Sequence, residues 1–88
     1  MNKTFNREAF KEKLEAQTSF PTLYMFKFIV PNGRESEISA IFPNNNISLK
    51  SSSKGNYVSA TIQAMMPSSD AIMEMYDKAA EIEGLISL

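Results

Sequence analysis

The stretch SSSKGNYVSATIQA, residues 51–64, decides the fold, because a turn within it leads into a long alternation of polar and apolar residues. The apolar positions are Val58, Ala60, Ile62 and Ala64, and the positions between them are Tyr57, Ser59, Thr61 and Gln63. A period of two is typical of a strand in a sheet that is covered on one side only. The SKGN sequence predicts a hairpin turn back to the segment NISLKSS, with Gly55 at positive φ and Asn56 able to tolerate one.

The segment TLYMFKFIV, residues 22–30, predicts a second long strand, because it is rich in aromatic and β-branched residues. One of its sides consists of Tyr24, Phe26, Phe28 and Val30, and the other consists of Leu23, Met25, Lys27 and Ile29. Burying an unpaired lysine would be costly, so the aromatic side is predicted to face the core. The side that contains Lys27 is then the open face of the sheet.

Two helices are predicted before the hairpin. The first follows Asn6, a suitable cap, and places Phe10 and Leu14 on a narrow apolar stripe. The second follows the PNG turn at residues 31–33, and its inward residues are Ile38, Ile41 and Phe42.

A third helix is predicted after Pro67, where Ser68 and Ser69 offer a cap and apolar residues continue at helical spacing as far as Ile82. Gly84 is expected to close this helix before LISL forms an edge strand. The order of elements is a helix followed by β-α-β-β-α-β, which predicts an α+β ferredoxin-like sandwich with its first and third strands at the centre. Residues 1–19 are expected to be an appended helical segment, and residues 20–88 the single domain.

The composition argues against several functional classes. The chain of 88 residues has no histidine and no cysteine, so the usual neutral-pH base, thiolate nucleophiles, disulfides and zinc ligands are missing. Its carboxylates fall on helix faces, where solvated surface is the simpler interpretation. We therefore expect no enzyme, no catalytic residues, no metal and no cofactor. Without an apolar run long enough for a membrane span, a cytoplasmic protein is expected.

Methionines and the hairpin each suggest a binding site, with a simpler structural alternative. Met25, Met65, Met66, Met73 and Met75 suggest an adaptable or soft-metal surface, but methionine in a small domain more often fills the core. The hairpin could hold an anion through Ser52, Ser53, Lys54, Gly55 and Asn56. A turn without a ligand is the preferred explanation of that hairpin, because its spacing does not match a phosphate loop.

Nucleic-acid binding is not expected. RNA-recognition domains of this topology place Lys/Arg-Gly and several aromatic residues on the third strand, whereas KGNYVSAT supplies Tyr57 alone. The chain also has a net charge of −1, which removes the long-range attraction to phosphates that drives such binding.

The segments FPTLYMFKFIV, SSSKGNYVSATI and IEGLISL, after a KEKLEAQ helix, resemble the YbeD-like proteins, a family of small bacterial proteins of unknown function. The middle helix, RESEISAIF, is shorter than is usual in that family. The resemblance implies a ferredoxin-like fold similar to ACT-type regulatory domains, which bind small effectors and often dimerise. It also implies an effector position at the first strand-helix turn, which corresponds to Asn32, Gly33 and Arg34.

These observations favour a non-catalytic regulatory or adaptor module that associates with itself as a homodimer, through the open sheet face or a sheet edge, or else with a protein partner. The interface residues expected from the open face are Leu23, Met25, Lys27 and Ile29. The alternative is a sensor of a small molecule or anion at the first strand-helix turn or at the hairpin.

Overall fold

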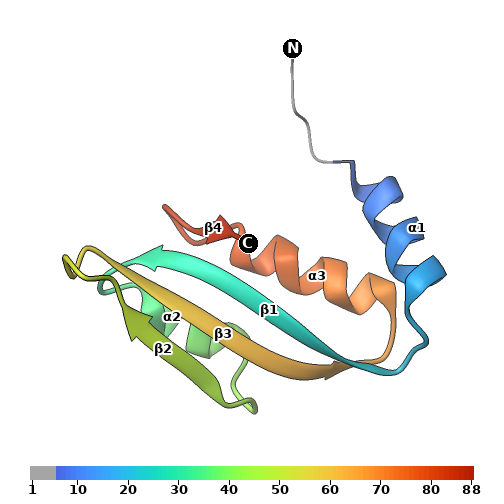
Figure 1. Cartoon of the computed structure of the whole chain (residues 1–88), viewed down its shortest axis with the longest axis horizontal. Helices are drawn as coiled ribbons and strands as arrows, with labels where there is room; N and C mark the ends of the chain where they lie inside the picture. The colour runs from blue at the N-terminus through green and yellow to red at the C-terminus, as the bar shows by residue number, and fades with distance from the viewer. Residues whose placement is uncertain (1–5) are drawn as a thin grey trace.

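A computed structural model describes residues 6–88 as one antiparallel sheet with helices on one side (Figure 1). The elements are α1 (Arg7–Gln17), β1 (Thr22–Pro31), α2 (Glu35–Ile41), β2 (Ile47–Ser51), β3 (Tyr57–Met66), α3 (Ser69–Ala79) and β4 (Ile86–Ser87). The strand order is β2-β3-β1-β4, so the first and third strands lie at the centre as predicted. This order confirms the α+β ferredoxin-like sandwich.

The two central strands pair along their whole length, from Thr22 opposite Met66 to Pro31 opposite Tyr57. The aromatic side of β1 faces the core, where the side chains of Phe26 and Phe28 are fully buried. This orientation leaves Lys27 exposed and confirms the prediction made from the cost of burying it.

Helices α2 and α3 both pack on the aromatic side of the sheet. Ile38 from α2 and Ile72 from α3 are fully buried in the same cluster as Ala60 of β3. The small side chain of Ala60 lets the helices approach the middle of the sheet. Ser68 caps α3 as predicted, since its hydroxyl oxygen accepts a hydrogen bond from the Ala71 N–H at 3.1 Å.

The end of α3 differs from the prediction. The helix stops at Ala79, and the chain continues through shorter turns, in which the Ile82 N–H donates to the Ala79 carbonyl at 3.0 Å. Such i to i−3 bonds tighten the backbone and satisfy groups that a helix end leaves unpaired. Ile82 is nevertheless buried, and Gly84 (φ 80°) lies in the turn before β4 and does not cap the helix.

Helix α1 lies against α3 (Figure 1). Its Leu14 is buried in the common core, and Phe10 meets Tyr76 edge-on with ring centroids 5.9 Å apart. The Lys11 ammonium lies 2.9 Å from the Asp70 carboxylate, which raises the pKa of Lys11 by a hydrogen bond and by charge attraction. The division at residue 19 stays a prediction, and residues 1–5 of that segment lie outside the described residues.

Candidate functional site

The open sheet face is the side of the sheet away from α2 and α3. Pairing in register brings Leu23 opposite Met65, Lys27 opposite Thr61, and Ile29 opposite Ser59. We define the open sheet face by the residues on this side of the four strands: Leu23, Met25, Lys27, Ile29, Ser48, Lys50, Tyr57, Ser59, Thr61, Gln63, Met65 and Ile86.

Large apolar side chains on this face are unusually accessible. The exposed fraction is 58% for Leu23, 48% for Met25, 62% for Met65 and 51% for Ile86. Exposed apolar residues are common singly, but a cluster on one face of a sheet marks an interaction surface. The open sheet face is therefore the strongest candidate for function.

All four interface residues expected from the sequence lie on this face, with Ile29 half-buried and the other three exposed. Two further apolar residues of this face, Met65 and Ile86, are not among the expected ones. Met25 lies on this face as expected, whereas Met65 is exposed although the core is the preferred place for the methionines; Met66 and Met73 are buried. Met65 continues the odd-numbered alternation of β3, so the period of two already contained this information. Ile86 joins the face only through its pairing with Ile29, which the sequence does not specify.

The apolar residues gather at two ends of the open sheet face. Leu23, Met25 and Met65 form one end, and Ile29, Tyr57 and Ile86 form the other. The central row contains Ser48, Thr61 and Lys27 side by side across three strands. Ile29 is six residue steps from Leu23, which corresponds to about 20 Å along a strand. The face thus presents two apolar ends with a polar, cationic belt between them.

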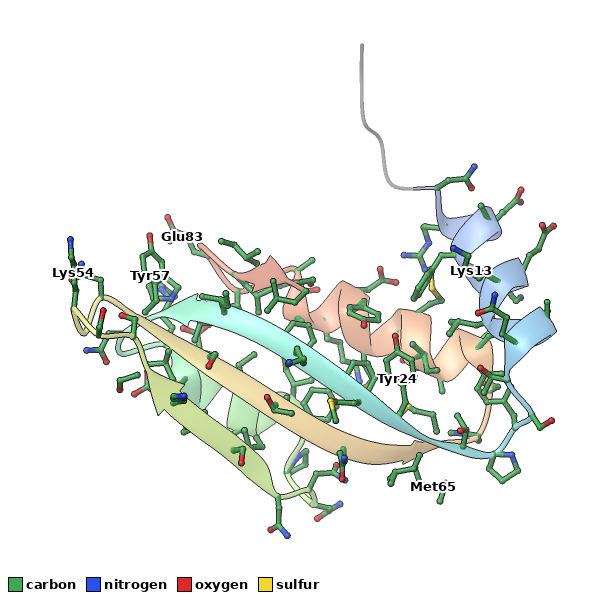
Figure 2. The ribbon with its side chains drawn as sticks, in the orientation of Figure 1. Lys13, Tyr24, Lys54, Tyr57, Met65 and Glu83 are labelled. Atoms are coloured by element: carbon green, nitrogen blue, oxygen red, sulfur yellow. The ribbon has the colours of Figure 1, made fainter. Side chains whose placement is uncertain are left out.

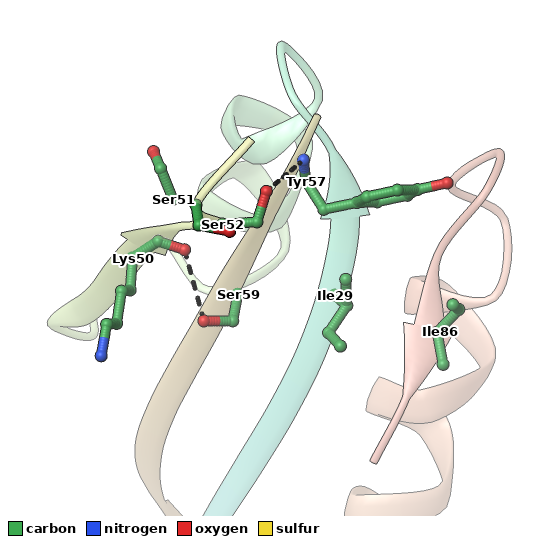
Figure 3. Close-up of a pocket in the computed structure, with 8 residues that line it drawn as sticks. Ile29, Lys50, Ser51, Ser52, Tyr57, Ser59 and Ile86 are labelled. Carbon is green, nitrogen blue, oxygen red and sulfur yellow. Dashed lines mark hydrogen bonds between the residues drawn. The ribbon is translucent and has the colours of Figure 1, made fainter. Parts of the chain in front are cut away.

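The second apolar end is hollowed into a shallow groove of about 550 Å³ (Figure 3). The ring of Tyr57 extends across the end of β1 towards β4, above Ile29 and Ile86. The serine side of the groove is fixed by hydrogen bonds: Ser59 Oγ donates to the Lys50 carbonyl, and Ser52 Oγ accepts from the Tyr57 N–H, each at 3.3 Å. Ser52 and Ser53, expected at an anion site, therefore line one wall.

The hairpin from residue 52 to residue 57 is closed by its own backbone. The Ser52 N–H donates to the Tyr57 carbonyl at 2.8 Å, and the Gly55 N–H donates to the Ser52 carbonyl at 3.0 Å. Gly55 has φ 75° as predicted, whereas Asn56 does not adopt a positive φ, because the single left-handed residue already turns the chain. Lys54 lies at the tip of the hairpin, at the same end of the molecule as Tyr57 (Figure 2).

The first strand-helix turn lies directly beside the hairpin. The Asn32 N–H donates to the Asn56 carbonyl at 2.9 Å, and Asn32 Nδ2 donates to the Gly55 carbonyl at 2.8 Å. The two regions that the sequence presents as alternative ligand sites therefore form one corner of the molecule.

Polar groups of this turn are already occupied by partners within the chain. The Gly33 N–H donates to Glu35 Oε1 at 2.7 Å, and the Arg34 guanidinium binds Glu37 at 2.7 Å and Glu83 at 3.3 Å. An anionic effector at Arg34 would have to displace two carboxylates, which weakens the case for a ligand there.

Charge is divided between the two layers of the molecule. All ten carboxylates belong to the three helices or to the turns after α3: Glu8, Glu12, Glu15, Glu35, Glu37, Asp70, Glu74, Asp77, Glu81 and Glu83. The charged residues of the strands and the hairpin are Lys27, Lys50 and Lys54. The open sheet face is therefore positive on a chain whose net charge is −1.

A partly buried polar pair lies on the opposite side of the sheet. The hydroxyl groups of Tyr24 and Tyr76 are 3.0 Å apart, and burial, with the hydrogen bond to Tyr24 as a smaller cause, raises the pKa of Tyr76. Both rings pack against Phe26, so the pair contributes to the packing of the core. Within residues 6–88, no three acidic side chains gather closely enough to bind a metal ion. The described helices all lack the length and apolar character needed to span a bilayer.

Comparison with known proteins gives a family without an assigned role. The family model described as "Protein of unknown function (DUF493)" matches residues 15–87. No curated protein and no solved structure matches the chain. The matched residues include every strand, so the whole open sheet face falls within the shared part of the chain.

Proposed function

Because the chain belongs to the DUF493 family of proteins of unknown function, we propose its role from the open sheet face: a non-catalytic regulatory or adaptor module that binds a protein there. The partner is a second copy of the chain or a different protein. The proposal includes the closer resemblance to YbeD-like proteins and ACT-type regulatory domains, and a place in the bacterial cytoplasm, which suits a chain without cysteine.

One observation carries this proposal. Leu23, Met25 and Met65 lie together at one end of the face, and each is about half exposed or more. Covering such a cluster stabilises a complex by removing apolar surface from water, at roughly 25 cal/mol for each Å². The belt of lysine and hydroxyl groups beside it resembles the polar surroundings of a moderate protein interface.

Site-specific photo-crosslinking tests the proposal. A photoreactive amino acid replaces Met65 on the open sheet face, or Leu49, which is 49% exposed on the other side of edge strand β2. We expect adducts in cells from position 65, to a second copy or to another protein identified by mass spectrometry. Adducts from position 49 alone, or none from either position, would contradict the proposed function.

Light scattering after size exclusion tests the self-associating form. A dimer at micromolar concentration should weaken in Leu23→Ser but not in Leu49→Ser, because the two leucines have similar exposure and lie on opposite faces. A strict monomer would rule out this form and leave a different protein as the partner.

A second candidate, a sensor of small molecules or anions, is favoured by the groove beside Ser52 and Ser53. A thermal-shift screen of amino acids and phosphorylated metabolites tests it. A ligand at about 100 times its dissociation constant adds about 2.7 kcal/mol of stability. The shift should shrink in Lys50→Ala or Ser52→Ala, both in the lining of the groove, and persist in Lys13→Ala on α1. If no compound shifts the melting temperature, the adaptor function is favoured over the sensor function.

A further inference from the structure

The ion pairs of the described residues leave the lysines of the sheet available for a partner. These pairs involve Arg7, Lys11 and Arg34, each from the helical layer or the turn before α2. By contrast, Lys27 and Lys50 are exposed on the open sheet face, where the strands contribute no carboxylate. A positive face of this kind favours a negative partner, because complementary charges speed association and exclude partners of like charge.

A second copy placed face to face would not neutralise the positive charge of the open sheet face. Lys27 lies near the middle of β1, in the central row of the open sheet face. A two-fold axis through the middle of the face would bring the central rows of both copies together, and with them Lys27 of each copy. Juxtaposed like charges are unfavourable in a partly desolvated interface, so a different protein is the better occupant.

The apolar residues distinguish a protein from a nucleic acid. Single-stranded nucleic acids bind positive surfaces on which aromatic rings stack against the bases. The large apolar residues of this face are mainly aliphatic or methionine, namely Leu23, Met25, Met65, Ile29 and Ile86, and the single ring is Tyr57. Such side chains suit the leucines and similar residues of an amphipathic protein segment.

We propose that the open sheet face binds an acidic amphipathic helix of another protein. The inference deepens the proposed function and rests on it. The helix would place apolar residues on the two ends of the face and carboxylates over Lys27 in the central belt and over Lys50, which lies one row further on, across β3 from Ile29. The ends lie about 20 Å apart along β1, which a helix covers in roughly 13 residues at 1.5 Å per residue. Helices already pack on the other face of the same sheet.

The test is a display selection of random 20-residue peptides on the immobilised full chain. We expect enriched peptides to combine Asp and Glu with Leu, Ile, Met or Phe at helical spacing, and to become helical on binding. Their affinity should fall about tenfold in Lys27→Glu and should weaken steeply with salt. Met65→Glu should abolish binding, because it places a charge at an apolar end.

Lys13→Glu is the matched control. It makes the same change of charge on α1, at a distance from the sheet (Figure 2). Binding of the selected peptides should remain within about twofold of wild type, since only charges near the interface act strongly at physiological salt. An equal loss in Lys13→Glu and Lys27→Glu would overturn the inference, because it would show a response to net charge alone.

Other outcomes separate this inference from the proposed function. Enriched peptides that need Met65 but carry no acidic excess would overturn the acidic partner and leave the adaptor function standing. A face-to-face dimer that Leu23→Ser disrupts would also overturn the acidic partner and leave the adaptor function standing. Salt-sensitive binding of a 20-nucleotide single-stranded RNA, lost in Lys27→Glu, would overturn the protein partner. No enrichment at all would overturn the inference, whereas the proposed function is tested separately by crosslinking at position 65.

Discussion

Gly84 and Gly55 have nearly the same backbone conformation, with φ 80° and 75°, but very different surroundings. A Cβ atom on Gly84 would lie 2.7 Å from Cγ of Pro31, whereas one on Gly55 would meet nothing within 4 Å. Comparing the two positions therefore separates the cost of a left-handed backbone from the cost of a collision.

We expect Gly55→Ala to lower the free energy of unfolding by about 1–2 kcal/mol, through the left-handed conformation alone. Gly84→Ala should cost about 1–3 kcal/mol more, because the Pro31 ring must move. Urea denaturation of both variants measures the difference. Equal losses would mean that the turn before β4 shifts at no cost.

The raised pKa of Tyr76 makes the stability of the folded chain depend on pH. Its pKa is raised in the folded chain, mainly by burial, whereas an unfolded tyrosine titrates near pH 10. The folded state therefore holds the proton more tightly, so its stabilising contribution is complete below about pH 10 and is lost as the pH rises further. Urea denaturation at successive pH values above 9 should show a steeper fall for wild type than for Tyr76→Phe. Identical slopes would contradict the assignment.

At the scale of elements, α1 is joined to the rest of the molecule by both apolar and polar contacts. Leu14 is buried in the common core, and Ser69 Oγ of α3 donates a hydrogen bond to Glu15 Oε2 at 2.6 Å. Leu14→Ala should lower the free energy of unfolding by about 2–4 kcal/mol through the cavity that it leaves. Lys13→Ala, one residue away on the exposed side, should change it by less than about 0.5 kcal/mol.

Chemical denaturation followed by two probes would show whether α1 unfolds with the sheet. Circular dichroism reports all helices, and tyrosine fluorescence reports Tyr24 and Tyr57 in the strands together with Tyr76 in α3. Coincident transitions are expected if α1 belongs to one cooperative unit. A separate early loss of helix would instead support the predicted division at residue 19.

Most elements could be predicted from periodicity, and their ends could not. Alternation in β1 and β3 identified both faces of the sheet, because a period of two is a geometric property of a strand. The end of α3 escaped prediction, because Ile82 keeps the apolar spacing of a helix while its backbone bonds to Ala79 at shorter range. The place of Ile86 depends on the pairing of β4 with β1, a long-range contact that no local pattern specifies.

At the scale of the whole molecule, the sheet layer and the helical layer carry opposite charge, although the net charge of the chain is only −1. Three lysines on the sheet and hairpin oppose ten carboxylates on the helical layer and the turns after α3. A chain with net charge −1 should therefore bind both anion and cation exchangers at pH 7 and low salt. Lys27→Glu combined with Lys50→Glu should lose retention on the cation exchanger.

The matched double variant carries Lys13→Glu and Lys78→Glu, both in helices. It has the same net charge as the sheet variant but leaves the lysines of the strands in place. We expect it to remain on the cation exchanger. Equal elution of the two double variants would show that the layers do not act as separate charged surfaces.

The pairing of β1 with β3 also determines how the chain reaches its structure. Strand β2 meets β3 through a short hairpin, whereas β1 can pair with β3 only after α2 and that hairpin are enclosed between them. Closing the longer loop costs chain entropy before the central contacts compensate for it. The hairpin is therefore free to form early, and the docking of β1 onto it should limit the folding rate. Substitutions at the aromatic positions of β1 should then slow folding, in addition to speeding unfolding.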